Sequence, residues 1–137
     1  MTRGYVDQDY PELCALYKHT ELYGGVFDEA RDGRERLSNK IAQDPDAILI
    51  HESNGQLDGT ISLIEDGRVA WLYRFIVVGF DPDVTKELYN KAVTILKDRG
   101  HSQVLVYSEA NNAQLDTKYQ ALGMTKGGNY TCFWAEI

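Results

Sequence analysis

The sequence predicts one α/β domain spanning residues 1–137, in which helices flank a mixed β-sheet. Three observations predict this class. Runs of strand length, separated by Asn-Gly and Asp-Gly pairs typical of tight turns, occupy the middle of the chain. The apolar period then becomes helical, and a helix–strand–helix–strand succession follows. The whole chain reads β-α-α-β-β-β-α-β-α-β, with no internal repeat or linker to divide it.

The first third is expected to hold one short strand and two helices. Asp7 or Asp9 offers a helix cap, and Pro11 suits a first helical turn. A glycine pair breaks the chain after this helix, and an Asp-Pro pair stops the second, more polar one. The expected ranges are 2–6 for the strand, about 7–17 for the first helix and 28–43 for the second.

Three strands are expected to follow as an antiparallel meander. An Asn-Gly pair after the first strand and an Asp-Gly pair after the second supply the tight turns. The third strand is apolar on both faces, which predicts a position inside the sheet. The expected ranges are 47–52, 57–64 and 69–78.

The last third alternates helices with strands. Asp81 is expected to cap a helix that begins at Pro82, and Gly100 to end it in a left-handed conformation. Because this helix joins two strands, those strands should run parallel through a right-handed crossover. The expected ranges are 82–99 and 111–122 for helices, and 103–107 and 130–137 for strands.

The composition excludes several functions. A net charge of −7 and a pI of about 4.9 argue against binding to nucleic acid. Acidity mildly favours cationic or amine substrates, although solubility alone is the more common reason for it. Cys14 and Cys132 lie far apart without a His/Cys cluster, so no metal site is predicted. The absence of an apolar leader or long apolar run leads us to expect a cytoplasmic protein that does not bind a membrane.

The last third also carries a family resemblance. Asn112 follows a short strand, Tyr119 comes seven residues later, and Leu122-Gly123-Met124 ends the helix. These positions, together with the run LKDRGHSQVLVYSEANN and the opening Arg3 with Asp9-Tyr10-Pro11-Glu12-Leu13, resemble the GNAT superfamily of N-acyltransferases. The resemblance covers nearly the whole chain. It implies acetyl-CoA as co-substrate and an amine of a small molecule or peptide as acceptor.

The resemblance also implies where the coenzyme lies. In this family the fourth and fifth strands splay apart, and the pantetheine arm pairs with backbone groups at the splayed end. The matching positions here are Phe75, Ile76 and Val77, which are also ordinary core positions of a strand. Only their backbone would take part in binding.

The segment after this strand departs from the family pattern. A Gln/Arg-x-x-Gly-x-Gly/Ala loop usually cradles the pyrophosphate, whereas Val78–Lys86 keeps only Gly79 and lacks the basic residue. Pro82 has no amide hydrogen, and Asp81 and Asp83 carry negative charge. Either the coenzyme binds in a modified way, with Lys86 or Lys118 supplying charge, or the pyrophosphate site is lost.

The resemblance implies that Tyr119 is the acid that protonates the leaving thiolate. The alternative is that Tyr119 only packs in the core. Asn112 would orient the coenzyme or simply cap the helix. The general base is open, because the third meander strand holds no carboxylate. Glu109, His51 and a chain of water molecules are the candidates.

Other features concern the acceptor and partners. Trp71, Tyr73 and Tyr107 could line an acceptor pocket or belong to the core. Residues 19–34 are the segment in which the family sets acceptor specificity, and similar proteins often form homodimers through the last strand. Two functions are compatible with the sequence: an N-acetyltransferase, and a GNAT-like binding or regulatory module without catalysis.

Overall fold

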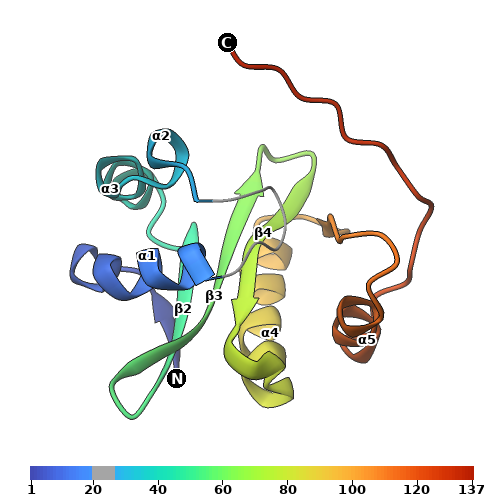
Figure 1. The fold of residues 1–137 in the computed structure, drawn as a ribbon, viewed down its shortest axis with the longest axis horizontal. Helices are drawn as coiled ribbons and strands as arrows, with labels where there is room; N and C mark the ends of the chain where they lie inside the picture. Colours follow the sequence, from blue (N-terminus) through green and yellow to red (C-terminus); the bar gives the residue numbers. More distant parts are fainter. Residues whose placement is uncertain (20–26) are drawn as a thin grey trace.

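The structure of the protein is a computed structural model that describes residues 1–19 and 27–137. A five-stranded sheet runs through it with helices on both faces (Figure 1), so the predicted mixed-sheet α/β class is confirmed. In chain order the elements are β1 (Thr2–Gly4), the 3-10 helix η1 (Asp7–Asp9), α1 (Tyr10–His19), α2 (Glu29–Asp32), α3 (Arg34–Gln43), β2 (Ile48–Ser53), β3 (Gln56–Glu65), β4 (Ala70–Val77), the 3-10 helix η2 (Val78–Phe80), α4 (Pro82–Asp98), β5 (Leu105–Val106) and α5 (Ala113–Ala121).

The strands lie in the order in which they occur along the chain, β1-β2-β3-β4-β5. The first three pairings are antiparallel, and β4 pairs with β5 in parallel. The predicted meander and parallel connection are therefore both confirmed. The apolar third strand of the meander, β4, has a neighbour on each side, as its composition predicts.

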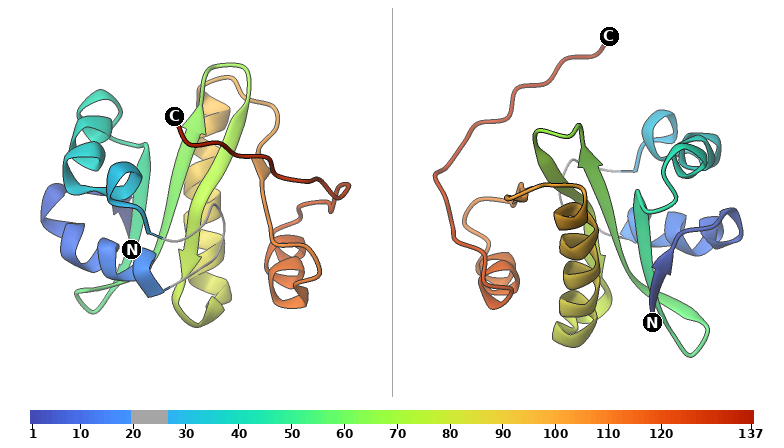
Figure 2. Two further views of the ribbon diagram at one scale, coloured as in Figure 1. Left: turned by 45° about the horizontal axis from the view of Figure 1, so that its top comes forward. Right: turned by 180° about the vertical axis from the view of Figure 1, so that it is seen from behind.

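Two apolar layers hold the sheet between its helices. Alternation in β2 sends Ile48 and Ile50 towards α1 and α3, and Leu49 towards α4. Each fully buried aliphatic side chain of this kind contributes about 1.5–3 kcal/mol relative to an exposed one. In Figures 1 and 2, α4 crosses one face of the sheet while α1, α2 and α3 lie on the other.

The helix expected over residues 28–43 is two helices, α2 and α3. Gly33 separates them with an extended backbone, φ −66° and ψ 153°. A Cβ atom there would lie 2.4 Å from the carbonyl oxygen of Glu29, so glycine allows this close turn. The break lets Asp32 before it and Leu37 after it both face the interior.

The strand predicted over residues 130–137 is wrong. Residues 124–137, which we call the tail, form no strand and extend away from the sheet (Figures 1 and 2). The exposed fractions of Tyr130, Phe133 and Trp134 are 84%, 91% and 80%. A strand requires a hydrogen-bonded partner as well as a suitable composition, and the tail does not pair with β5. The strand β5 is itself shorter than predicted.

Candidate active site

The two neighbouring strands β4 and β5 separate after a short common stretch. Their ladder consists of Trp71 with Leu105 and Leu72 with Val106. Within the described residues, no strand pairs with that side of β4 beyond Leu72. We call residues 73–77 of β4, together with the α5 side chains that face them, the fork. Backbone N–H and C=O groups along this edge require partners that a strand does not supply.

A bulge in β4 lies at the start of the fork. Thr60 of β3 is opposite Ile76 and Ser62 is opposite Tyr73, so β4 has one more residue than β3 over this stretch. Within that stretch Arg74 has φ 49°, an unusual value for a side chain of this size. A bulge bends its strand and increases its twist. This bend accounts for the separation of β4 from β5.

A buried ion pair accompanies the bulge. Arg74 has a fully buried side chain and donates to the Asp32 carboxylate over 2.6 Å, and Asp32 is 2% exposed. The guanidinium also lies over the rings of Tyr17 and Tyr73, at 5.2 Å from each centroid. Sequence reasoning missed this pair, although an arginine inside an otherwise apolar strand was a visible signal. It joins α1 and α2 to β4 at the fork.

The helix α5 provides the opposite wall of the fork. Asn112 caps this helix, because its side-chain oxygen accepts from the backbone N–H of Leu115 over 3.1 Å. Leu115 is fully buried, and Tyr119, 6% exposed, packs at 6.2 Å between ring centroids from Phe75. The structure thus brings Tyr119 to one of the three expected coenzyme-binding positions and gives Asn112 the capping role.

Lys118 also lies inside the fork, 8% exposed. Its ammonium group donates to the backbone carbonyl of Phe75 over 2.7 Å and lies 3.9 Å from the centroid of that ring. Burial lowers the pKa of Lys118 to about 7. The ammonium group of Lys118 is therefore held at β4, beside Phe75. Lys118 follows the buried Leu115 by three residues, which is the spacing of one helix face.

In the loop before α4, hydrogen bonds within the loop and the first helical turn use the backbone N–H groups. Gly79 adopts φ 63°, which its missing side chain allows, and the Asp81 carboxylate accepts from the backbone N–H groups of Asp83 and Val84. Pro82 has no N–H, and the N–H of Thr85 donates to the Asp81 carbonyl over 3.0 Å. The donors with which a helix terminus would bind an anion are thus absent or already engaged. Lys86 is exposed one turn further along.

The aromatic candidates lie at the beginning of the fork. Trp71 and Tyr107 stack at 4.6 Å between centroids with an interplanar angle of 22°, and Tyr107 remains 65% exposed. Strand alternation places Trp71 and Tyr73 on the same face of β4, the side of α1 and α2. The structure therefore brings these three side chains together. Of the expected acceptor segment 19–34, residues 20–26 lie outside the described residues.

The two candidate bases lie on different parts of the fold: Glu109 follows β5 near the start of α5, and His51 is on β2. Glu109 is exposed beside the start of α5 and accepts from the Asn112 side chain over 3.4 Å. His51 is on β2, which β3 separates from β4. Its ring contacts Asp58 at 2.5 Å and Glu87 at 2.8 Å. The structure therefore does not bring His51 to the fork.

Residues 1–19 and 27–137 contain neither a membrane-spanning helix nor a cluster of metal-ligating side chains. None of the helices there combines the length and apolar character needed to cross a membrane. No three potential metal-ligating side chains gather there either, and both cysteines are free.

Comparison with known proteins connects this geometry to one fold. No family model and no curated protein sequence matches the chain. Among solved structures, a ribosomal-protein-alanine N-acetyltransferase from Brucella melitensis superposes with a TM-score of 0.75 at 18% identity, covering 93% of this chain and 86% of its own. An aminoglycoside 6'-N-acetyltransferase from Acinetobacter haemolyticus gives 0.73 at 14% identity, covering 100% and 99%.

The PaiA N-acetyltransferase from Thermoplasma acidophilum, solved in complex with coenzyme A, gives a TM-score of 0.69 at 20% identity, covering 88% of this chain and 86% of that one. At these identities the likeness concerns the fold. The chain therefore has the fold of GNAT-type acetyltransferases, and the architecture implied by Asn112, Tyr119 and Leu122-Gly123-Met124 is confirmed.

Proposed function

We propose that this protein is an N-acetyltransferase that moves an acetyl group from acetyl-CoA to an amine of a small molecule or peptide. One observation supports the proposal above all others. The separation of β4 from β5 leaves a polar backbone edge, and α5 presents Tyr119 against that edge at Phe75. The acetyltransferase fold of the chain agrees with this reading, and the fork is the part of the fold that suits an extended thioester.

In this proposal the backbone of Phe75, Ile76 and Val77 holds the pantetheine arm. The carbonyl of Phe75 accepts a hydrogen bond from Lys118 outside the sheet, as expected of an edge whose polar groups have no strand partner. Gly79 and Lys86 would lie towards the pyrophosphate. The Asp81 carboxylate already accepts from the backbone N–H groups at the start of α4. We therefore infer that the protein binds the pyrophosphate in a modified way and more weakly than an unoccupied helix terminus would.

Acetyl-CoA would supply the thioester, and the chain's own side chains would manage the protons. Tyr119 would donate to the leaving sulfur, since a phenol with an ordinary pKa near 10 donates a hydrogen bond without ionising. Glu109, or water, would receive the proton of the acceptor amine. Trp71, Tyr73 and Tyr107 would offer aromatic faces to an incoming ammonium group.

Thermal melting with acetyl-CoA tests the proposal directly. A ligand at 100 times its Kd adds about 2.7 kcal/mol of stability when it binds only the folded state. A melting temperature unchanged at millimolar coenzyme would eliminate the function. Binding without transfer to any amine of a broad panel would instead favour a non-catalytic module.

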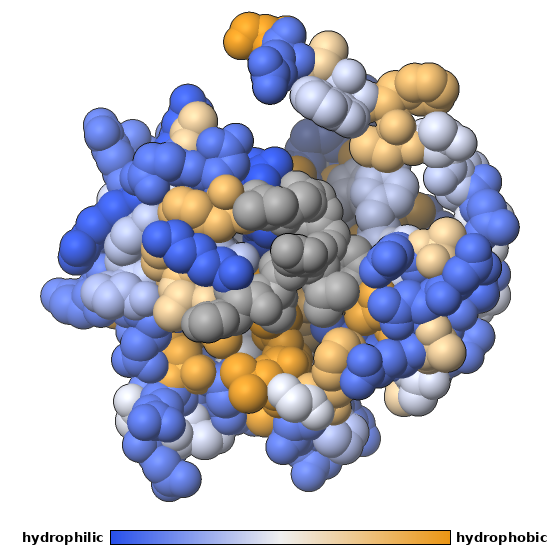
Figure 3. Space-filling model, in the orientation of Figure 1, coloured by the Kyte–Doolittle hydropathy of each residue, from blue (hydrophilic) through white to orange (hydrophobic). Residues whose placement is uncertain are grey.

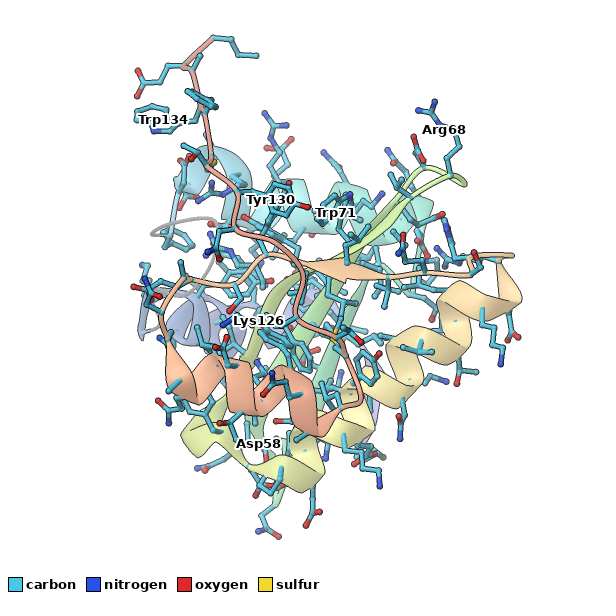
Figure 4. All side chains as sticks on the ribbon, turned by 90° about the vertical axis from the view of Figure 1, so that its right-hand side faces the viewer. Asp58, Arg68, Trp71, Lys126, Tyr130 and Trp134 are labelled. Carbon is cyan, nitrogen blue, oxygen red and sulfur yellow. The ribbon has the colours of Figure 1, made fainter. Side chains whose placement is uncertain are left out.

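We further propose that the protein forms a homodimer in which each tail adds a strand to the β5 edge of the other copy. The tail stands off the body of the molecule (Figure 3), and its large side chains Tyr130, Phe133, Trp134 and Ile137 are exposed. Figure 4 shows Tyr130 and Trp134 on this segment. Apolar residues occur on both faces of this stretch, as in a strand buried within a sheet. Its composition therefore suits strand pairing better than exposure to water.

The receiving edge has matching features. The strand β5 pairs only with β4, so its other edge is open among the described residues. Beside it lies a hollow of about 450 Å³ with a mixed lining, whose apolar part includes Tyr89, Val93, Val104 and Met124 and whose polar part includes Lys97, His101 and Gln103. Sedimentation tests the dimer: a tail that folds back onto its own β5 would give a monomer at all concentrations.

A further inference from the structure

A lysine amine forms part of the wall of the fork. Lys118 Nζ lies 2.7 Å from the Phe75 carbonyl oxygen, 3.9 Å from the centroid of the Phe75 ring and 5.3 Å from that of Tyr119. The other lysines of the described residues are exposed, at positions 18, 40, 86, 91, 97 and 126. Lys118 is thus the one buried lysine of that part of the chain.

Burial also changes the protonation of this amine. An ordinary lysine with a pKa near 10.4 is almost wholly charged at neutral pH and is therefore no nucleophile. Desolvation lowers the pKa of Lys118 to about 7, so about half of these amines are neutral at that pH. Among the described residues, Tyr119 of the same helix contributes a titratable ring 5.3 Å from this amine, and β4 presents the uncharged Phe75. Neither neighbour supplies a carboxylate that would restore the charge.

We propose that Lys118 is itself an acceptor, so that the protein acetylates its own side chain from acetyl-CoA lying in the fork. This inference rests on the proposed function. The Phe75 carbonyl is one of the groups proposed to pair with the pantetheine arm, and Lys118 Nζ is already in contact with it. A neutral amine is therefore held beside the path of the thioester.

The reaction balances without an oxidant or reductant. The lone pair of neutral Lys118 Nζ forms a bond to the thioester carbonyl carbon, and the bond from that carbon to sulfur breaks. The amine nitrogen gives up one proton, and the departing thiolate gains one, which the Tyr119 hydroxyl of the same helix would donate in the proposed mechanism. The products are free coenzyme A as a thiol and an acetyl-lysine amide at residue 118.

The product suits its surroundings. An acetyl-lysine keeps one N–H, which can still donate to the Phe75 carbonyl. It carries no charge, so the cost of burying an ammonium group disappears. The added acetyl group would also occupy part of the fork. We therefore expect the acetylated protein to bind coenzyme A at least tenfold more weakly than the unmodified one.

The test uses the full chain with isotope-labelled acetyl-CoA, followed by intact-mass and peptide mass spectrometry. We expect one labelled acetyl group, mapped to Lys118. Lys118→Arg should lose it, whereas Lys126→Arg, which changes an exposed lysine, should keep it. Acetyl phosphate needs no coenzyme site and should label exposed lysines while sparing Lys118. Excess free coenzyme A should slow labelling of Lys118 by competition.

The pH dependence adds an independent readout. The labelling rate should level off above about pH 8 and fall close to tenfold per pH unit below about pH 6, as the neutral amine is lost. NMR titration of the Lys118 side chain without coenzyme should give a midpoint near 7. A midpoint near that of an ordinary lysine would remove the nucleophile and overturn the inference.

The outcomes separate the inference from the proposed function. If coenzyme A raises the melting temperature but Lys118 stays unmodified, the inference fails and the acetyltransferase proposal stands. If coenzyme A neither binds nor labels, both fail. Should Lys118→Arg not fold, Lys118→Met replaces it, and the mapping of the label on the wild-type chain remains decisive.

Discussion

Arg74 and Asp32 form an ion pair of 2.6 Å in which both side chains are buried, at the bulge where β4 leaves β5. Two buried charges are costly to desolvate, and each depends on the other for compensation. The pair joins the bulge of β4 to α2 on one side of the sheet. The geometry of the fork therefore depends on a contact between residues 42 positions apart.

The first prediction concerns that pair. Arg74→Ala leaves Asp32 buried without this partner, and we expect a loss of about 3–5 kcal/mol in the free energy of unfolding. Arg68→Ala provides the matched control, since it removes an arginine that is exposed at the far end of the β3–β4 turn (Figure 4) and paired with Asp66. Breaking that pair should cost about 0–1 kcal/mol. Urea denaturation measures both, and equal losses would contradict the assigned role.

The second prediction concerns the proposed acid. Tyr119→Phe keeps the ring that packs on Phe75 and removes only the hydroxyl. We expect turnover to fall about 10²–10⁴-fold, the range of general acid catalysis, with coenzyme affinity little changed. Tyr130→Phe, in the exposed tail, is the control and should retain turnover. Steady-state kinetics and calorimetric binding decide the matter, and undiminished turnover in Tyr119→Phe would exclude the hydroxyl from the mechanism.

The third prediction concerns the capped helix. Asp81→Ala frees the N–H groups of Asp83 and Val84 and removes a negative charge from the start of α4. The protein should lose about 1 kcal/mol of stability through the lost cap, while its affinity for coenzyme A should rise.

Asp81→Asn separates these two effects, because asparagine still caps while lacking the charge. We expect it to retain stability and to gain part of the affinity. Calorimetric titration with coenzyme A supplies the measurement. Affinity that stays constant in both variants would mean that the pyrophosphate does not approach this terminus.

The fourth prediction is a pH dependence of stability. Native Lys118 loses its proton near pH 7, whereas in the unfolded chain it keeps the proton to about pH 10.5. Between these values the unfolded state binds more protons, so stability rises with pH. Relative to Lys118→Met, the wild-type protein should gain up to about 1.4 kcal/mol per pH unit between pH 8 and 9, and about half of that at pH 7.

Urea denaturation at each pH gives this comparison, and only the difference between the two proteins is diagnostic. The hydrogen bond to the Phe75 carbonyl, which methionine lacks, contributes an offset that does not vary with pH. Parallel stability curves for the two proteins would show that Lys118 titrates normally in the folded state.

The fifth prediction concerns the tail. Trp134→Ser and Phe133→Ser together should convert the proposed dimer into a monomer, because they remove the apolar contacts of the exchanged strand. Lys126→Ser is the control, since this residue precedes the exchanged stretch and pairs with Asp116 of its own copy. Sedimentation equilibrium measures the outcome, and a monomeric wild-type protein would refute the exchange.

Local sequence signals predicted most of the architecture. The tight turns after β2 and β3, the cap at Asp81 and the cap at Asn112 are each fixed by residues within a few positions of one another. Local rules failed where a distant partner was required. The stretch 130–137 has the composition of a strand, but no strand among residues 1–19 and 27–137 pairs with it.

The candidate site also has a part that was predicted from the sequence and a part that was not. Tyr119 and the strand positions Phe75–Val77 were reached through the family resemblance, and the structure brings Tyr119 against Phe75. The burial of Lys118 and the pair formed by Arg74 and Asp32 were not predicted. Both depend on which side chain meets which backbone across the sheet, and residue types at helical or strand spacing do not specify that.

The sequence by itself determined most of the order of helices and strands as far as α5, because propensities, caps and turns act between residues close along the chain. Only the tertiary structure decided where β4 leaves β5, which charges are buried there, and that the amine of Lys118 faces the carbonyl of Phe75. These features arise from contacts between residues more than 30 positions apart, where burial and electrostatics depend on three-dimensional proximity.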